Sequence, residues 1–178
     1  MQGIFKGWGV RRWPAVVAVI AVVTLQNASA AVQIPADIKG DRVVVLKSQR
    51  VLLILRGDSV VDTFRVALGR DPVGPKNRAG DGRTPEGHYV LDWRNAESRF
   101  YRSIHISYPA PSDVEQARHM KLSPGGSVMI HGLPKGAEEI GTDHAKWDWT
   151  DGCIAVSNSE MDEIWRRVDD GTPIDILP

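Results

Sequence analysis

The sequence predicts one mainly β domain with two or three short helices. Between residues 42 and 68 apolar and polar residues alternate, which is the pattern of half-buried strands. Later in the chain, only two segments combine a helix-start signal with enough residues for a helix. The chain shows no internal repeat and no linker, so one domain with a single core is expected.

The strands are predicted from short apolar runs bounded by polar turns or by Gly and Pro. The expected strands are 43–46, 51–55, 60–68, 88–91, 103–108 and 128–130, with a closing strand at 174–177. The segment 69–87 contains five glycines and three prolines, so it is predicted to be a long loop. Loops of that length in a compact domain are usually functional or mobile.

Two helices are predicted from capping boxes, in which a Ser and a Glu three residues later satisfy free backbone N–H groups. Ser112 and Glu115 predict a helix over 113–122, which a Pro-Gly-Gly sequence ends. Ser157 and Glu160 predict a second helix. Its apolar face is expected to consist of Met161, Ile164, Trp165 and Val168.

The first thirty residues read as an export signal. Three basic residues precede an apolar run over 15–25, and a small-residue triplet ends at Ala30. A spanning helix needs roughly 20 apolar residues, so cleavage after Ala30 is expected rather than a permanent anchor. The predicted parts are a signal peptide over 1–30, a lead-in over 31–40 and a domain over 41–178.

The charge balance excludes some partners. Removing the three basic residues of the signal from 22 Lys and Arg leaves 19, against 22 Asp and Glu, a formal charge of −3. A mildly acidic domain argues against nucleic acid or anionic lipid as a partner. Contact with a membrane is expected only if the signal is not cleaved.

The single cysteine, Cys153, needs an explanation in an exported protein. An odd cysteine there is either a partner in an intermolecular disulfide or a reactive thiol. It follows a polar turn of Thr150, Asp151 and Gly152, and a short apolar strand follows it. In such a turn the amides of Gly152 and Cys153 are expected to be unpaired and able to bind a developing oxyanion.

A thiol with a pKa of about 8.5 needs a neighbouring base to be a good nucleophile at neutral pH. The best candidate is His131, which ends the strand 128–130 and precedes Gly132. Although Cys153 lies 22 positions after His131, two strand ends can lie side by side. The segment 133–150 would then form a flap over the site.

These residues together resemble the catalytic signature of the L,D-transpeptidase (YkuD-type) family. Ile130-His131-Gly132 is similar to its His-Gly strand end, and Thr150-Asp151-Gly152-Cys153-Ile154 is similar to its Ser/Thr-x-Gly-Cys motif. Asn158, five residues after the cysteine, and the Thr-Pro-Glu-Gly sequence at 84–87 also match. The resemblance covers about 41–177, and the Trp-Thr-Asp-Gly-Cys-Ile-Ala-Val motif resembles a Gram-negative branch, which implies a periplasmic location.

The resemblance implies a mixed sheet wrapped as a sandwich or barrel, and a peptidoglycan-modifying cysteine acyltransferase. Cys153 would attack the diaminopimelate carbonyl of a stem tetrapeptide, and the thioester would pass to an amine acceptor, a second stem or an envelope protein. His131 would be the base, and oxyanion or substrate-binding roles fall to Gly152, Asp151, Thr150 and Gly132. No cofactor and no metal are implied. Hydrolysis of the same thioester, releasing stem peptides or a wall-linked lipoprotein, is the alternative.

One departure from the family pattern concerns the charge near the thiol. Most members carry Arg two residues after the cysteine, and here that residue is Ala155. A guanidinium can hold a carboxylate with two hydrogen bonds, and alanine cannot. Either Arg83, Arg99 or Arg102 supplies the charge, or the substrate is presented differently.

Several residues have a structural interpretation beside a functional one. Asp151 either orients a partner or shapes the turn, and Thr150 either donates to the site or caps the turn. Asn158 is expected to secure its turn, and His144 to be a surface histidine. Trp147 and Trp149 form either a substrate wall or a core plug.

Two other classes of function are weighed against acyl transfer. A metallohydrolase would draw its ligands from His105, His131, His144, Cys153 or a nearby Asp, but no pair of these shows a recognisable zinc spacing. A non-catalytic wall-binding module would retain the fold without using the thiol.

Overall fold

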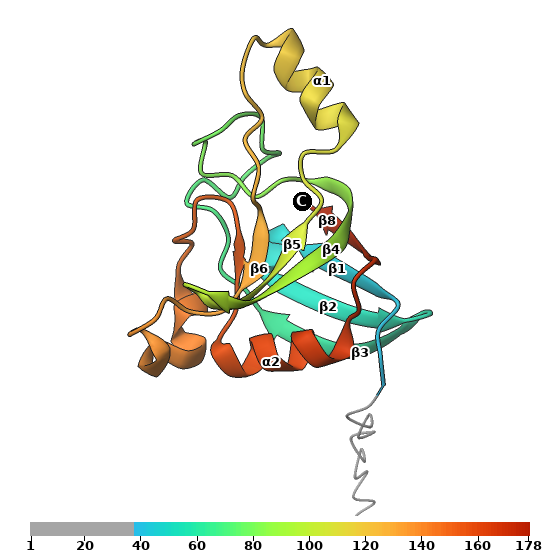
Figure 1. The fold of residues 1–178 in the computed structure, drawn as a ribbon, viewed down its shortest axis with the longest axis vertical. Coiled ribbons are helices and arrows are strands. Elements are labelled where there is room, and N and C mark those ends of the chain that lie inside the picture. The colour runs from blue at the N-terminus through green and yellow to red at the C-terminus, as the bar shows by residue number, and fades with distance from the viewer. Residues whose placement is uncertain (1–37) are drawn as a thin grey trace, which may run out of the picture. The chain divides into compact units, whose positions relative to one another are not determined.

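The computed structural model describes residues 38–178, which form one curled sheet of eight strands (Figure 1). The strand order across the sheet is β3-β2-β1-β8-β4-β5-β6-β7. The strands are β1 (Arg42–Leu46), β2 (Val51–Arg56), β3 (Ser59–Arg65), β4 (Gly87–Ser98), β5 (Tyr101–Ile106), β6 (Met129–His131), β7 (Ile154–Ala155) and β8 (Thr172–Leu177). The helices are α1 (Pro111–His119) and α2 (Asn158–Arg167), with 3₁₀ helices η1 (Lys47–Gln49) and η2 (Glu138–Lys146).

The sheet is mixed and curls back on itself. The β1–β8 and β6–β7 pairs are parallel and the other pairs are antiparallel. After β3 the chain crosses to the far edge, where Ala67 and Ala155 exchange backbone hydrogen bonds of 2.9 and 3.0 Å. The predicted mainly β fold with a barrel-like sheet is confirmed, although β3 ends at Arg65 instead of continuing to Leu68.

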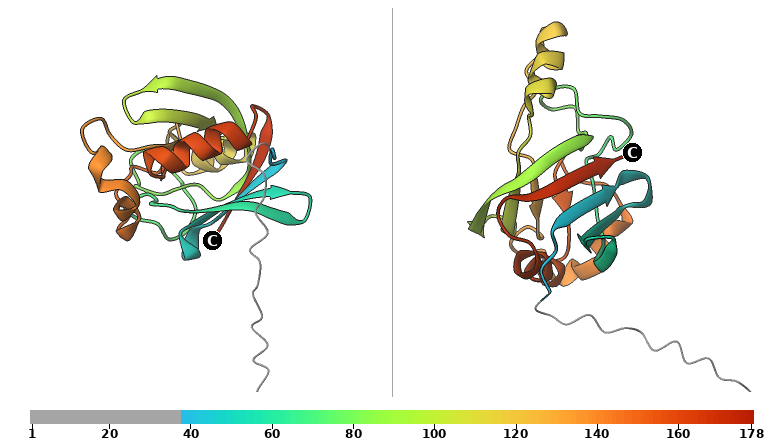
Figure 2. Two further views of the ribbon diagram at one scale, coloured as in Figure 1. Left: turned by 90° about the horizontal axis from the view of Figure 1, so that it is seen from below. Right: turned by 90° about the vertical axis from the view of Figure 1, so that its right-hand side faces the viewer.

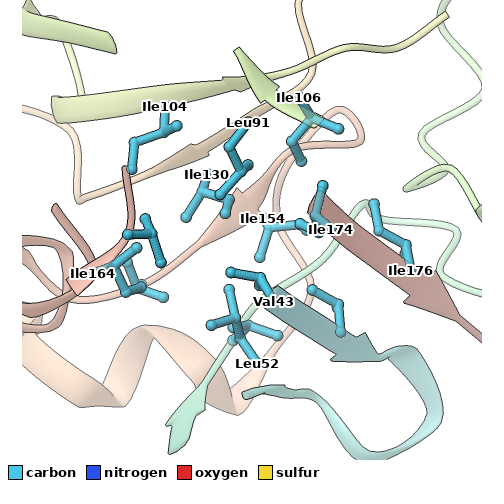
Figure 3. Packing of buried hydrophobic residues seen from close by; sticks show 14 of the residues in the cluster. Val43, Leu52, Leu91, Ile104, Ile106, Ile130, Ile154, Ile164, Ile174 and Ile176 are labelled. Carbon is cyan, nitrogen blue, oxygen red and sulfur yellow. The ribbon is translucent and has the colours of Figure 1, made fainter. Parts of the chain in front are cut away.

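The core fills the inside of this curl and is rich in Ile, Val and Leu (Figure 3). Figure 2 shows α2 lying across one side of the sheet. Met161, Ile164 and Val168 of the helix stripe are fully buried, as predicted, and Trp165 packs against them while only partly buried. The burial of this stripe fixes α2 and therefore the turn that precedes it.

The two predicted helix starts have different outcomes. Ser157 is the N-cap of α2, and its amide donates to Glu160 Oε2 at 2.8 Å, so that capping box is confirmed. The first prediction is wrong, because α1 begins at Pro111 and the Asp113 carboxylate accepts from the Ala110 amide at 2.8 Å. A proline is favoured in the first turn, and an acidic residue three positions after the cap replaces Glu115 in the box. In Figure 1, α1 projects away from the sheet, with only Ala117 of its nine residues buried.

The predicted long loop is present over 66–86 and is fixed by buried polar contacts. The Lys47 ammonium, 2% exposed, donates to Gly74 O at 2.7 Å, Thr84 O at 2.9 Å and Glu86 Oε1 at 2.8 Å. Thr84 also accepts from the Gly69 amide through Oγ1, at 3.0 Å. The Thr-Pro-Glu-Gly sequence therefore ties both ends of the loop to η1.

The predicted signal peptide lies outside the described residues. Within residues 38–178, none of the helices has the length and apolar content that crossing a membrane requires.

Candidate active site

Two short paired strands bring the predicted histidine and cysteine together. In the β6–β7 pair, Ile130 lies opposite Ile154 and His131 opposite Ala155. Ile130 and Ile154 are fully buried in the core. Because successive strand residues point to opposite faces, His131 and Cys153 share the other face. Because the two strands are parallel, Cys153 lies beside Met129 at the start of β6, whereas His131 is at the end of β6. The two residues are therefore brought to one face two positions apart, and not by adjoining strand ends as the sequence suggested.

Cys153 lies between two cavities. The first, which we call the aromatic cavity, has a volume of about 280 Å³ and is lined by Arg99, Phe100, Ser127, His131, Trp149, Thr150, Asp151 and Cys153. The second, the polar cavity, has a volume of about 440 Å³ and is lined by Arg70, Lys76, Ala79, Gly80, Gly125, Gly126, Ser127, Val128, Asp151, Gly152 and Cys153. A peptide that passes over the thiol can thus place one end in each cavity.

His131 is held as a neutral base. It is 3% exposed, and its Nδ1 lies 2.7 Å from the carbonyl oxygen of Gly132. A carbonyl only accepts, so Nδ1 carries the proton and Nε2 keeps its lone pair. Burial lowers the pKa of His131 to about 4, despite the hydrogen bond to Gly132. Phe100 and Trp149 enclose the imidazole, with ring centroids 4.6 and 5.7 Å away.

Cys153 is held as a neutral thiol. Burial raises the pKa of the thiol, and the hydrogen bond from Met129 N–H and the charge of Lys76 only partly oppose that rise. Its sulfur lies 3.8 Å from the carbonyl oxygen of Ser127, to which the S–H donates. No hydrogen bond joins Cys153 to His131 in the part of the chain that the structure describes. A thiol and an imidazole that are both neutral suit general-base activation during attack rather than a preformed ion pair.

The turn before the cysteine differs from the prediction in one respect. The Gly152 amide was expected to be unpaired, but it donates to Thr150 Oγ1 at 3.1 Å. The Thr150 hydroxyl in turn donates to the Cys153 carbonyl at 2.8 Å, so Thr150 caps the turn. Among residues 38–178, no acceptor takes the Cys153 N–H. The oxyanion donor that remains available is therefore the Cys153 amide.

Close backbone contacts hold this turn against the long loop. Gly152 has φ +126°, and a Cβ there would lie 2.5 Å from the carbonyl oxygen of Arg83. A Cβ on Gly69 would lie 2.0 Å from the carbonyl oxygen of Gly82. Thr150 exchanges hydrogen bonds with this segment, from its amide to Leu68 O and from the Arg70 amide to its own carbonyl. Glycine is therefore required before the cysteine for both conformation and space.

The remaining predicted residues of the turn and strand have defined places. Asp151 lies on the rim of both cavities, is 80% exposed and pairs with Arg70. The Gly132 amide donates to Arg102 O at 3.1 Å, and its carbonyl orients His131. Asn158 Oδ1 accepts from the Leu133 amide at 2.8 Å, so it secures the exit from β6 rather than its own turn.

The three arginines proposed to replace the missing guanidinium do not gather at the thiol. Arg102 pairs with Asp162 at 2.8 Å, and Arg83 pairs with Asp71 at 2.9 Å. Only Arg99 lines a cavity next to Cys153, where its guanidinium lies 5.0 Å from the centre of the Phe100 ring. Lys76 and Arg70, which line the polar cavity, were missed by the sequence reasoning. The only feature of the sequence that could have indicated them is that they are basic residues in a Gly- and Pro-rich loop.

The flap over 133–150 contributes its last residues to the site. Trp149 lines the aromatic cavity, and Trp147 is 52% exposed outside it. Asp148 anchors the flap by accepting from Arg50 Nη2 at 2.7 Å and from the Leu68 amide at 2.9 Å. His144 was expected on the surface, but it is a buried residue of the flap, 2% exposed, with Glu160 Oε2 3.8 Å from its Nε2. Packing of η2 against the start of α2 buries it.

The other histidines contact carboxylates away from the thiol. His105 pairs with Asp92 and stacks on Trp93, so it does not approach the site. His88 pairs with Asp175, and His119 pairs with Glu115. Within residues 38–178, no three His, Cys, Asp or Glu side chains gather as a set of metal ligands.

Comparison with known proteins agrees with this geometry. The family model described as "L,D-transpeptidase catalytic domain" (YkuD) matches residues 40–176. YafK of Escherichia coli strain K12, provisionally named an L,D-transpeptidase, is 30% identical over 112 residues, which is 61% of this chain and 37% of YafK.

Solved structures show the same fold. The helical cell shape determining protein Pgp2 from Campylobacter jejuni superposes with a TM-score of 0.57 at 22% identity, covering 75% of this chain and 46% of Pgp2. Bd1075 of Bdellovibrio bacteriovorus superposes with a TM-score of 0.53 at 21% identity, covering 79% of this chain and 48% of Bd1075. The chain thus spans less than half the length of these relatives.

Proposed function

Because this chain belongs to the family of L,D-transpeptidase catalytic domains, we propose that it is a peptidoglycan-modifying acyltransferase that works through a thioester on Cys153. The observation that carries the proposal is that His131, the last residue of β6, and Cys153, the residue before β7, line one cavity. The donor would be a stem tetrapeptide, attacked at its diaminopimelate carbonyl.

The two neutral groups define the order of proton transfers. As the sulfur attacks the carbonyl, the thiol proton passes to His131 Nε2, whose partner nitrogen stays bonded to Gly132 O. The Cys153 amide donates to the oxyanion, and a donor of this kind is worth about 3 kcal/mol in comparable sites. Collapse then breaks the amide bond, and the His131 imidazolium returns the proton to the amine of the departing D-Ala. The thioester remains on Cys153.

The acceptor step uses the same histidine. An amine that enters on the side of His131 gives up a proton to Nε2 as it attacks the thioester, and the thiol is regenerated. Water can follow the same route, which would make the protein an amidase or endopeptidase. The observation that supports this second candidate is the small aromatic cavity, about 280 Å³, which admits water more readily than a second stem.

We place the reaction in the periplasm, on the basis of the signal-like sequence over 1–30. The Trp-Thr-Asp-Gly-Cys-Ile-Ala-Val motif over 149–156 supports a Gram-negative branch of the family. The partners would be stem peptides of the wall and an amine on a second stem or on an envelope protein.

Digestion of purified sacculi tests the function. The protein lacking residues 1–30 is incubated with sacculi, and the muropeptides are separated and identified by mass. New diaminopimelate-linked cross-links would support transfer to an amine, whereas released stems or lipoprotein without new links would support hydrolysis. No change relative to a Cys153→Ala control would overturn both.

A further inference from the structure

Lys76 presents a buried ammonium group to the polar cavity. Its side chain is 4% exposed, and it lines the cavity together with Gly152 and Cys153. The ammonium nitrogen lies 3.6 Å from the point that a Cβ on Gly152 would occupy. A positive charge is thus placed beside the turn that carries the nucleophile.

Comparison with Lys47 shows that the hydrogen bonds of Lys76 are incomplete. Lys47 is equally buried, and its three N–H groups meet three acceptors at 2.7 to 2.9 Å. Lys76 donates to Asp81 Oδ1 at 2.8 Å and to no other acceptor among residues 38–178. An ammonium has three donors, and leaving buried donors unmet is costly. Lys76 therefore has room for a ligand oxygen on the cavity side.

The loop holds Lys76 in place from behind. Asp81 also accepts from the amides of Asn77 at 2.8 Å, Arg78 at 3.0 Å and Arg83 at 3.1 Å. Burial alone would raise the pKa of Asp81, but the bonds from Lys76 and these amides lower it to about 2. The carboxylate is thus charged and fixed by the backbone, and it orients Lys76 toward the cavity.

The strand on the other side of the thiol offers no such cation. Ala155 faces the same side as His131, is completely buried and carries no charge. A stem tetrapeptide carries carboxylates on diaminopimelate and on its terminal D-Ala. We propose that the Lys76 ammonium binds a stem carboxylate in the polar cavity and so selects free-acid stems over amidated stems. This inference rests on the proposed function.

Acylation kinetics with matched stems test the inference. Rates of acyl-enzyme formation are measured for a free-acid tetrapeptide and for peptides amidated at one carboxylate at a time. Replacing Lys76 by Met should raise the KM for the free-acid stem about 10- to 100-fold, with the saturated rate changed less than about threefold. For the stem amidated at the bound carboxylate, Lys76→Met should change little. The carboxylate bound by Lys76 is the one whose amidation abolishes the difference in KM between the wild type and Lys76→Met.

Two further variants separate recognition from folding. Lys76→Gln keeps hydrogen-bond donors without the charge and should lose part of the preference for the acid. Lys47→Met removes the other buried ammonium and should lower stability while leaving the acid-to-amide ratio unchanged. Equal losses on acid and amidated stems in a folded Lys76→Met protein would overturn the inference. Absence of any acyl-enzyme in the wild type would instead overturn the proposed function, and the inference with it.

Discussion

The two cavities that meet at Cys153 differ in the chemistry of their walls. The polar cavity is walled by the backbone-rich loop over 66–86 and by 125–128, with Lys76 and Arg70 as its cations. The aromatic cavity is walled by Phe100 and Trp149 around a buried imidazole. Two cations thus line one side of the thiol, while the other side has a buried neutral imidazole between aromatic rings, with Arg99 and Asp151 also in its wall.

This difference indicates that substrate recognition and proton transfer take place on opposite sides of the thiol. Recognition of an anionic peptide needs an unscreened cation with free donors, which the polar cavity supplies. Proton transfer needs a base that is unprotonated at the working pH, and burial keeps the imidazole of His131 neutral. Each wall can therefore be altered separately by substitution.

The largest effect is expected on the aromatic side. Replacing His131 by Gln removes the base and should slow acylation by a stem tetrapeptide about 10²- to 10⁴-fold. Alkylation of Cys153 by iodoacetamide, which uses the thiolate formed by solvent, should change less than about threefold. Stopped-flow acylation and mass-monitored alkylation measure the two rates. Equal slowing of both would mean that His131 positions the turn rather than moving a proton.

On the polar side, the largest expected effect is on stability. Lys47→Met breaks a buried ion pair and leaves Gly74 O and Thr84 O without their donor. Removing one partner of such a pair typically costs about 3–5 kcal/mol of unfolding free energy. Urea denaturation measures it, with Lys39→Met as control, since the exposed Lys39–Asp169 pair is worth less than about 1 kcal/mol. A similar cost for both would contradict the role given to Lys47.

The turn between the cavities should respond to a single methyl group. Gly152→Ala forces a left-handed residue and places its Cβ 2.5 Å from Arg83 O. We expect a loss of about 1–3 kcal/mol from backbone strain, increased by this contact. Gly171→Ala is the matched control, because Gly171 has φ +93° but no atom within 4 Å of its Cβ position. Thermal unfolding of both variants isolates the contribution of the contact.

The smallest expected effect is that of moderately acidic pH on the rate of acylation. The pKa of His131 is lowered to about 4, so the imidazole is neutral and competent from pH 7 down to about pH 5. Acylation by the stem should therefore fall less than about twofold over that range, and steeply below pH 4. Rates in buffers of constant ionic strength measure the profile. A midpoint near 6.5, the ordinary value for histidine, would show that the base is not buried during attack.

The sequence was sufficient for features that depend on local patterns. Alternation over 42–68 located β1, β2 and β3, and the spacing of Ser157 and Glu160 located the start of α2. His131 and Cys153 could be paired because each flanks a short apolar strand, and such strands pair readily in a sheet. The same spacing gave a wrong start for α1. There Asp113, and not Glu115, is the acidic residue of the capping box, and it accepts from the Ala110 amide.

Features that depend on contacts between distant segments could not be predicted. Lys76 reaches the nucleophile's turn only because the long loop packs its backbone against Gly152. The Gly152 amide, expected to be unpaired, donates to the hydroxyl of Thr150. The spacing of the two residues does not predict this hydrogen bond. The burial of His144 follows from η2 packing on α2, which no periodicity in the flap indicates.

The central claim, that Cys153 forms a thioester with a stem peptide using His131, is tested most directly by intact-mass analysis. The protein lacking residues 1–30 and its Cys153→Ala and His131→Gln variants are each exposed to a diaminopimelate-containing tetrapeptide and quenched in acid. We predict an adduct of the stem minus D-Ala on the wild type, at most a trace on His131→Gln, and none on Cys153→Ala. An adduct on Cys153→Ala, or none on a folded wild type, would contradict the account.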